Sequence, residues 1–377
     1  MFTRRIHIFK LFGFNVNLDV SWFFLLILVT WSLATGFFPR SYTGFSTLSY
    51  WLMGIAAAAG LFFSIVLHET LHSIVARRFG LQMTGITLFL FGGVAEMGDE
   101  PPSPKAEFSM AIAGPILSIV LAGVFFGTSV LMKKGGLPSS LWGVLRYLGF
   151  INGLLAAFNL VPAFPLDGGR VLRSAIWKAR NDLRAATRIT SMIGRVFGFI
   201  LIAFGVYSFI MGSLMSGLWW FIIGLFLNTA ARTAYQQIKI RTVLEGQKVS
   251  RFMKTDPVTV PDNITVSEMV EEYVYRHHYK LFPVIRDGKL VGCVTTKQMK
   301  ELPRDEWWSR TVGEIAEECT DENSVSPDTD AVKVLGTMRR NSTSRLMVVA
   351  NKKLVGVITL KDLLEFIALK LELEHEE

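Results

Sequence analysis

Long uncharged, apolar stretches alternate with short charged segments over the first 235 residues of the chain. A helix needs about 20 apolar residues to cross a bilayer. Runs of this kind lie at residues 20–39, 41–67, 108–132 and 147–166, and a longer one extends from Val196 to Ala231. The longest run exceeds one span, and Met211–Gly217 in its middle indicates a turn. The pattern therefore predicts an α-helical polytopic membrane domain of about six transmembrane helices.

The segment between the second and third predicted spans does not have a helical pattern. Residues 82–95 are rich in Thr, Ile and Phe and are interrupted by Gly92-Gly93. This composition predicts a short β-hairpin. Because an unpaired strand edge cannot face lipid, the hairpin must be covered or must line a cavity.

After Tyr235 the sequence has the composition of a soluble protein and repeats one plan twice. Residues 249–300 and residues 312–365 each hold short β-prone runs, a helix-like stretch and a hairpin turn, so that Thr295 and Thr359 occupy corresponding positions. Internal repetition on this scale indicates a paired module. We therefore expect a membrane domain over residues 1–240, followed by an α+β pair of repeats.

The charge of the chain agrees with this division. Charged residues make up 19% of the 377, below the roughly 25% of soluble domains. The net charge is +8, and the surplus lies between the apolar runs, where Lys and Arg orient membrane proteins. We therefore expect contact with membrane lipid and no nucleic-acid partner.

The same rule predicts the topology. The basic loop from Arg170 to Arg195 belongs in the cytosol, which also places both termini and the repeats there. The two cysteines, Cys293 and Cys319, have no metal-binding spacing and fit reduced cytosolic thiols. The expected location is the cell membrane, as a multi-pass protein with cytoplasmic ends.

The sharpest chemical signal is His68-Glu69-Thr70-Leu71-His72, where the apolar pattern of the second predicted span continues beyond residue 67 to Arg77. Histidines four residues apart share a helix face and can bind one Zn²⁺ ion, beside which Glu69 can act as a general base. The alternative is a pair of core histidines without a ligand. Ionisable groups inside a span are costly and by default functional, which favours the metal site.

Two histidines leave a catalytic zinc short of one protein ligand. The candidate is Asp167, in the segment from Asn159 to Arg170. Two prolines break the helix there, and unwound backbone at membrane depth is tolerated only around a cavity. The alternative for Asp167 is a surface carboxylate that pairs with Arg170 or Arg173.

Together these two motifs resemble the site-2 protease family of intramembrane zinc metalloproteases. The resemblance rests on His-Glu-x-x-His in one span and Asn-x-x-Pro-x-x-Pro-x-Asp-Gly-Gly in a later one, and it covers residues 10 to 235. Also similar are the Phe91-Gly-Gly-Val94 hairpin, the Pro101–Glu107 loop and Ala113-Gly-Pro115. The family hydrolyses peptide bonds within or near transmembrane segments of membrane proteins, in regulated intramembrane proteolysis.

The resemblance implies a role for each residue of the site. His68, His72 and Asp167 would be the zinc ligands, Glu69 the general base, and Asn159 a contact for the substrate or the developing oxyanion. Asn159 could equally make an interhelical hydrogen bond. Zinc hydrolysis needs an extended peptide, so the hairpin edge is a candidate docking strand.

The C-terminal repeats resemble a pair of cystathionine-β-synthase-type (CBS) domains. Such pairs often bind adenosine nucleotides through a Thr-x-x-Asp motif, which implies a site for ATP, ADP or AMP at Thr359 and Asp362. The first repeat has Gln298 where this motif has Asp, so we expect one nucleotide site rather than two. The alternative is a structural module that joins two copies in a homodimer.

Two other functions remain to be compared with a protease. One is a membrane transporter or channel gated by the CBS pair, with a structural metal site. The predicted spans have no internal symmetry of the kind common in transporters. The other is an inactive scaffold, against which the intact Glu69 argues.

Overall fold

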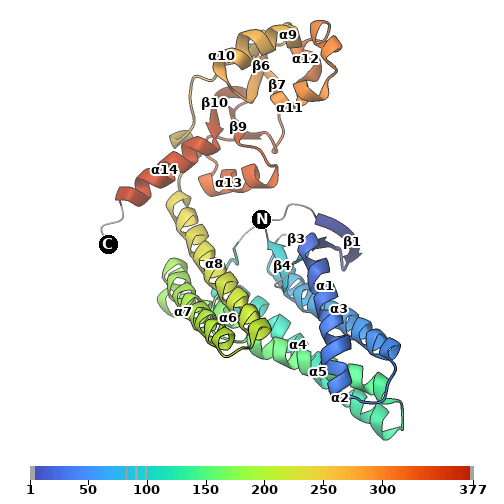
Figure 1. The fold of residues 1–377 in the computed structure, drawn as a ribbon. Helices are drawn as coiled ribbons and strands as arrows, with labels where there is room; N and C mark the ends of the chain where they lie inside the picture. The colour runs from blue at the N-terminus through green and yellow to red at the C-terminus, as the bar shows by residue number, and fades with distance from the viewer. Residues whose placement is uncertain (1–4, 82, 90–91, 98–99, 374–377) are drawn as a thin grey trace. The chain divides into compact units, whose positions relative to one another are not determined.

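The computed structural model describes residues 5–81, 83–89, 92–97 and 100–373. The chain divides into two compact units, Met1–Ile238 and Lys239–Glu377. Unit one is mainly helical and contains one sheet, whereas unit two contains two small sheets flanked by helices. Figure 1 labels the helices and strands of both.

Five helices of the described residues are long and apolar enough to cross a membrane. They are Val20–Ser41 (α1, Val20–Ser32; a π-helical turn, Leu33–Phe37; α2, Phe38–Ser41), α3 (Thr47–Arg78), α4 (Pro104–Lys134), α5 (Ser139–Asn159) and α7 (Leu183–Ile210). A further long helix is α8 (Leu214–Leu244). The predicted turn in the longest apolar run is confirmed, because α7 ends at Ile210 and Gly212 follows with φ of 82°. A sixth span through α8 stays a prediction.

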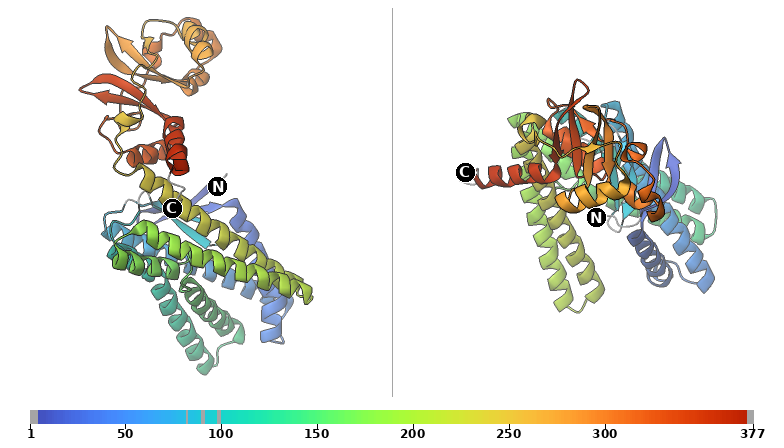
Figure 2. Two further views of the ribbon diagram at one scale, coloured as in Figure 1. Left: turned by 90° about the vertical axis from the view of Figure 1, so that its left-hand side faces the viewer. Right: turned by 90° about the horizontal axis from the view of Figure 1, so that it is seen from above.

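Helices α7 and α8 lie side by side, as Figures 1 and 2 show. Glycines allow the close approach. A Cβ added at Gly205 would come under 3.0 Å from the backbone of Phe221, and one at Gly198 would do the same with Gly224. The small residues of this apolar run therefore bring two helix backbones into direct contact, as is common between helices in membranes.

The predicted hairpin is confirmed as β3 (Met83–Phe89) and β4 (Gly92–Met97), which pair antiparallel. Its turn, including Phe91, lies outside the described residues. The hairpin belongs to a larger sheet of order β1-β2-β3-β4. Strands β1 (Arg5–Leu11) and β2 (Phe14–Asp19) form a second hairpin, and β2 runs parallel to β3.

This N-terminal hairpin was not predicted, although its pattern is present in the sequence. Phe14, Val16 and Leu18 alternate with polar residues, and all three are buried. They pack with Trp22 of α1 and Val66 of α3. Alternation of period two is the signature of a half-buried strand, and here it fixes the sheet against the helix that carries His68.

A compact bend separates α5 from α6 (Asp167–Arg180) at the two predicted helix-breaking prolines. Three glycines make the bend possible. A Cβ added at Gly168, Gly169 or Gly194 would come under 3.0 Å from backbone atoms of the bend itself. The chain therefore folds tightly over the start of α6, and Asp167 is the first residue of that helix.

The second unit confirms a paired α+β module. One sheet contains β5 (Val260–Pro261), β6 (Leu281–Arg286) and β7 (Lys289–Thr295), and the other contains β8 (Ser324–Val325), β9 (Arg345–Ala350) and β10 (Lys353–Thr359). Helices α11 (Thr296–Glu301) and α14 (Leu360–Leu373) follow the two hairpins.

The two repeats of this unit exchange backbone pairs with each other. Lys254, which precedes the first repeat's sheet, pairs with Val357 of β10. Glu317, which precedes the second repeat's sheet, pairs with Cys293 of β7. The exchange ties the two repeats into one body.

Burial raises the pKa of the Cys293 thiol to about 12, so this thiol is chemically inert near neutral pH.

Candidate metal centre

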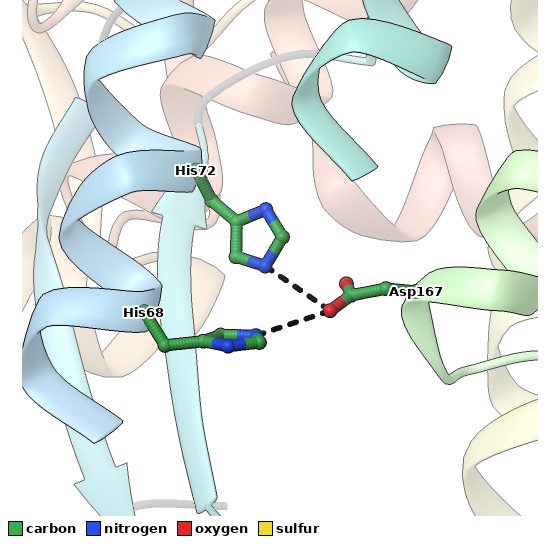
Figure 3. A group of neighbouring side chains, drawn as sticks. All are labelled: His68, His72 and Asp167. Atoms are coloured by element: carbon green, nitrogen blue, oxygen red, sulfur yellow. Dashed lines mark hydrogen bonds and ion pairs between the residues drawn. The ribbon is translucent and has the colours of Figure 1, made fainter. Parts of the chain in front are cut away.

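Three buried side chains from two helices meet at one point in unit one. His68 and His72 lie one turn apart on α3, and Asp167 begins α6. The Nε2 atoms of the two histidines lie 3.1 and 3.2 Å from the same oxygen, Oδ2 of Asp167. Figure 3 shows both rings directed at this carboxylate. Among the described residues this is the one group of three side chains arranged to hold a metal ion.

In a neutral imidazole, the hydrogen bond at Nδ1 decides whether Nε2 carries a proton or a lone pair. Nδ1 of His72 lies 2.6 Å from the carbonyl oxygen of Met110. A carbonyl can only accept, so Nδ1 carries the proton and neutral His72 presents a lone pair at Nε2. That lone pair faces a carboxylate oxygen, which is also an acceptor. Between two such acceptors there must be a proton or a metal ion, and the arrangement therefore fits a metal ion.

The spacing is compatible with zinc. Tetrahedral zinc with ligands at 2.0–2.2 Å places neighbouring ligand atoms about 3.3 Å apart. The observed separations of 3.1 and 3.2 Å are close to that value. Two imidazoles and one carboxylate are also a ligand set of catalytic zinc, which leaves a fourth position open.

Helix α4 leaves room for the site through one glycine. A Cβ added at Gly114 would come under 3.0 Å from Nε2 of both His68 and His72. Ordinary side chains never approach this closely. Gly114 was part of the Ala113-Gly-Pro115 motif, but the sequence did not show that this residue faces the histidines.

Of the two alternative partners of Asp167, Arg170 lies 4.0 Å from Glu107 through its Nε, and Arg173 is also engaged by acidic residues other than Asp167. Arg173 is buried, and its Nε donates to Glu107 of α4 at 2.6 Å while its Nη2 donates to Glu100 at 3.3 Å. Within the described residues, the ion pairs of the Asp167 carboxylate are those with the two histidines. Arg173 therefore binds α6 to α4, and Asp167 faces the opposite way into the site.

Glu69 lies beside the three-residue group and is not part of it. Its carboxylate is close enough to interact electrostatically with His68, Asp167 and Arg170. A Cβ added at Gly93 of β4 would come under 3.0 Å from the Glu69 side chain. The first residues of β4 therefore pass directly over Glu69.

Asn159 is the last residue of α5 and is half-buried. Within the described residues no hydrogen bond of its side chain is found. The interhelical bond is made instead by Asn152, which is fully buried and donates from Nδ2 to Ser64 Oγ of α3 at 3.0 Å. Asn152 was not predicted, because an Asn in an apolar helix gives no sign of which neighbour it faces.

The second candidate site lies in the CBS-like unit. Thr359 N and Oγ1 both donate to Oδ2 of Asp362, at 3.0 and 2.5 Å. Lys254 Nζ lies 3.8 Å from the other oxygen of this carboxylate. In the first repeat, Thr295 and Gln298 form the same local cap, but the Gln298 amide also donates to the Ile315 carbonyl at 3.3 Å. Gln298 is thus engaged in a link between the repeats.

Comparison with known proteins agrees with both halves of this description. The model of peptidase family M50 matches residues 56–140 and 130–204, and the CBS domain model matches residues 249–303 and 312–369. The putative zinc metalloprotease Rip3 of Mycobacterium tuberculosis (strain H37Rv) is 34% identical over 360 residues, which cover 95% of this chain and 91% of the relative. The chain belongs to peptidase family M50.

Other relatives of this M50 peptidase agree with that assignment. The zinc metalloprotease MJ0392 of Methanocaldococcus jannaschii is 30% identical over 373 residues, covering 98% of both chains. The solved site-2 protease from the same species is 28% identical and covers 62% of this chain and 95% of its own, with a TM-score of 0.43. From the family model and the Rip3 and MJ0392 relatives, the M50 peptidase is a zinc metalloprotease, and the transporter alternative is not favoured.

Proposed function

We propose that this M50 peptidase hydrolyses peptide bonds within or near the transmembrane segments of other membrane proteins, at a zinc site made by His68, His72 and Asp167. The observation that carries the proposal is the meeting of these three buried groups between helices of membrane-spanning length. A hydrolytic site at that position can reach bonds that soluble proteases cannot. We place the protease domain at residues 1–240 and the CBS repeats at 249–300 and 312–365.

The residues around the site divide the chemistry between them. A zinc ion held there would supply Lewis-acid chemistry, polarising the scissile carbonyl and making water a stronger nucleophile at neutral pH. Glu69 accepts the proton of the attacking water and passes it to the leaving amine. Asn159, at the end of α5, donates its amide to the substrate carbonyl as negative charge develops there.

Strand β4 supports a mode of substrate docking. Among the described strands, β4 is paired on one side with β3 and has no strand on its other side. Its first residues pass over Glu69. A locally unwound substrate segment added to this free edge would be held extended beside the general base, by main-chain hydrogen bonds that do not depend on sequence.

We further propose that both termini and the CBS pair lie in the cytosol. The support comes from the Arg and Lys residues of α6, of the first half of α7 and of the C-terminal part of α8. Many large apolar side chains of the long helices are exposed, which supports a location in the bilayer.

Asp167→Asn is expected to weaken zinc binding, because the amide loses the negative charge that faces both imidazoles. Purified protein should retain Zn²⁺ during dialysis against a chelator, whereas the variant should lose it, as measured by metal analysis. Asp328→Asn is the matched control, since Asp328 is exposed and pairs only with Lys248. Equal zinc retention in Asp167→Asn and the control would show that another group completes the site.

The CBS pair is proposed to bind ATP, ADP or AMP at Thr359 and Asp362. A carboxylate can accept from both hydroxyls of a ribose, and the Thr359 hydroxyl and the Lys254 ammonium can bind phosphate. The local geometry supports this, because Asp362 keeps one oxygen for Thr359 and directs the other toward Lys254. Nucleotide can regulate cleavage only if it binds two arrangements of the protein with different affinity.

Asp362→Ala is expected to abolish nucleotide binding by the full chain in detergent, as measured by calorimetry. Gln298→Ala is the matched control, since Gln298 caps α11 in the same way but belongs to the other repeat. The control should bind like the wild type. Equal heats from both variants would contradict the assignment, and no heat from any adenine nucleotide with the wild type would leave the pair a structural or dimerising role.

A further inference from the structure

One face of α4 lies against the two histidines of α3. Met110, Gly114 and Ser118 are spaced by four residues, so they share that face. The Met110 carbonyl contacts Nδ1 of His72, Gly114 leaves space for both Nε2 atoms, and Ser118 Oγ lies 2.9 Å from Nδ1 of His68. Each imidazole therefore has a hydrogen-bond partner from α4 at its Nδ1 atom.

The Ser118 hydroxyl differs from the other buried hydroxyls of these two helices. Buried Ser and Thr side chains usually donate to a carbonyl about one turn earlier in their own helix. Four hydroxyls of α3 and α4 do so: Ser64, Thr70, Ser73 and Ser129. Ser118 is fully buried, and within the described chain its one hydrogen bond crosses to His68. Its hydroxyl is therefore committed to the histidine.

We infer that Ser118 is a positioning residue for the zinc site, which orients the His68 ring and accepts the Nδ1–H of that ring when Nε2 faces a metal ion. This inference rests on the proposed zinc site. If Nδ1–H donates to Ser118 Oγ, Nε2 must present its lone pair toward Asp167. Without the hydroxyl, the proton can move to Nε2 and hydrogen-bond the carboxylate directly. That tautomer competes with the metal for the same nitrogen.

The Met110 carbonyl performs the same task for His72, but no side-chain change removes it. Ser118 is thus the one side chain through which the arrangement can be tested. Partners of this kind behind a metal-binding histidine typically contribute 10–100-fold to metal affinity. Ser118→Ala is expected to weaken Zn²⁺ binding by about this factor.

The experiment measures Zn²⁺ affinity by competition with a chelator in the Glu69→Gln background, where no cleavage disturbs the reading. Ser129→Ala on the same helix is the control, because its hydroxyl bonds only the carbonyl of Phe126 in its own helix. It should bind zinc as the wild type does. The Co²⁺-loaded protein gives a second readout, since its visible absorption should change in Ser118→Ala and stay unchanged in Ser129→Ala.

A second pair of variants covers the case in which Ser118→Ala does not fold. Ser118→Thr and Ser118→Val have the same shape and differ only in the hydroxyl, so any crowding affects both equally. Zinc affinity should be higher in Ser118→Thr, by the same 10–100-fold. Equal affinity within the pair, or wild-type affinity in Ser118→Ala, would overturn the inference. A wild-type chain that binds no zinc would instead contradict the proposed function itself.

Discussion

Replacing Glu69 with Gln is expected to abolish cleavage while the protein keeps its zinc. Loss of a general base typically slows a reaction by 10²–10⁴-fold. Glu69 lies outside the group of ligand atoms, and Gln has the same size, so its packing under Gly93 of β4 should persist. The measurement is cleavage of a single-span membrane protein in detergent, with zinc content determined on the same sample.

The control for this prediction is Glu69→Asp, which keeps a carboxylate but withdraws it by one methylene. Its activity should fall between that of the wild type and that of Glu69→Gln. Wild-type cleavage by Glu69→Gln would remove Glu69 from the mechanism. Loss of zinc in Glu69→Gln would mean that the carboxylate binds the metal and that the ligand set is wrong.

Gly114→Ala is expected to empty the metal site. The new methyl group would come closer to both Nε2 atoms than real Cβ contacts do, and both rings are held by a hydrogen bond to α4 and by contact with Asp167. Only displacement of the rings from Asp167 would relieve the clash. Zinc per chain should therefore fall from one to near zero, and cleavage should fall with it.

The same substitution at Gly123 is the control, because an added Cβ there meets nothing within 4 Å. Gly123 lies on the same helix, and Ala is favoured over Gly in a helix by about 1 kcal/mol. Gly123→Ala should therefore keep its zinc and melt no lower than the wild type. Full zinc occupancy in Gly114→Ala would show that α4 lies farther from the histidines than described here.

Much of the candidate site could be predicted because its residues carry a local pattern. His68 and His72 are four residues apart on a helix, a spacing that places them on one face whatever surrounds them. Asp167 follows two helix-breaking prolines, which indicated an unwound segment. The structure brings these three residues together, although their roles as zinc ligands stay a prediction until metal is measured.

What could not be predicted depends on contacts between distant segments. The partner of His68 is a serine 50 residues away, and the partner of His72 is a backbone carbonyl, which has no sequence signal at all. Asn152 and Ser64 form a buried pair for which the sequence offers only two polar residues in apolar helices. Such pairs depend on how helices cross, and one sequence does not specify this.

The N-terminal hairpin is a different kind of omission. Its alternating pattern at residues 14–18 is a strand signal, but the run is short and leads directly into the first apolar span at Val20. Gln298, in contrast, was identified as a departure from the Thr-x-x-Asp motif, and its contact with Ile315 provides a physical reason for it. Gln can donate a hydrogen bond to a backbone carbonyl, whereas an ionised Asp at this position could only accept.

The two outer edges of the four-stranded sheet are unlike each other. The β1 edge has a bulge between His7 and Phe9 and exposes Lys10, two features that discourage further strands from pairing. The β4 edge runs on from the Gly93 contact with Glu69. Because each copy of the enzyme has one open edge and one blocked edge, polymerisation through the sheets is disfavoured, while the β4 edge stays open to an added strand.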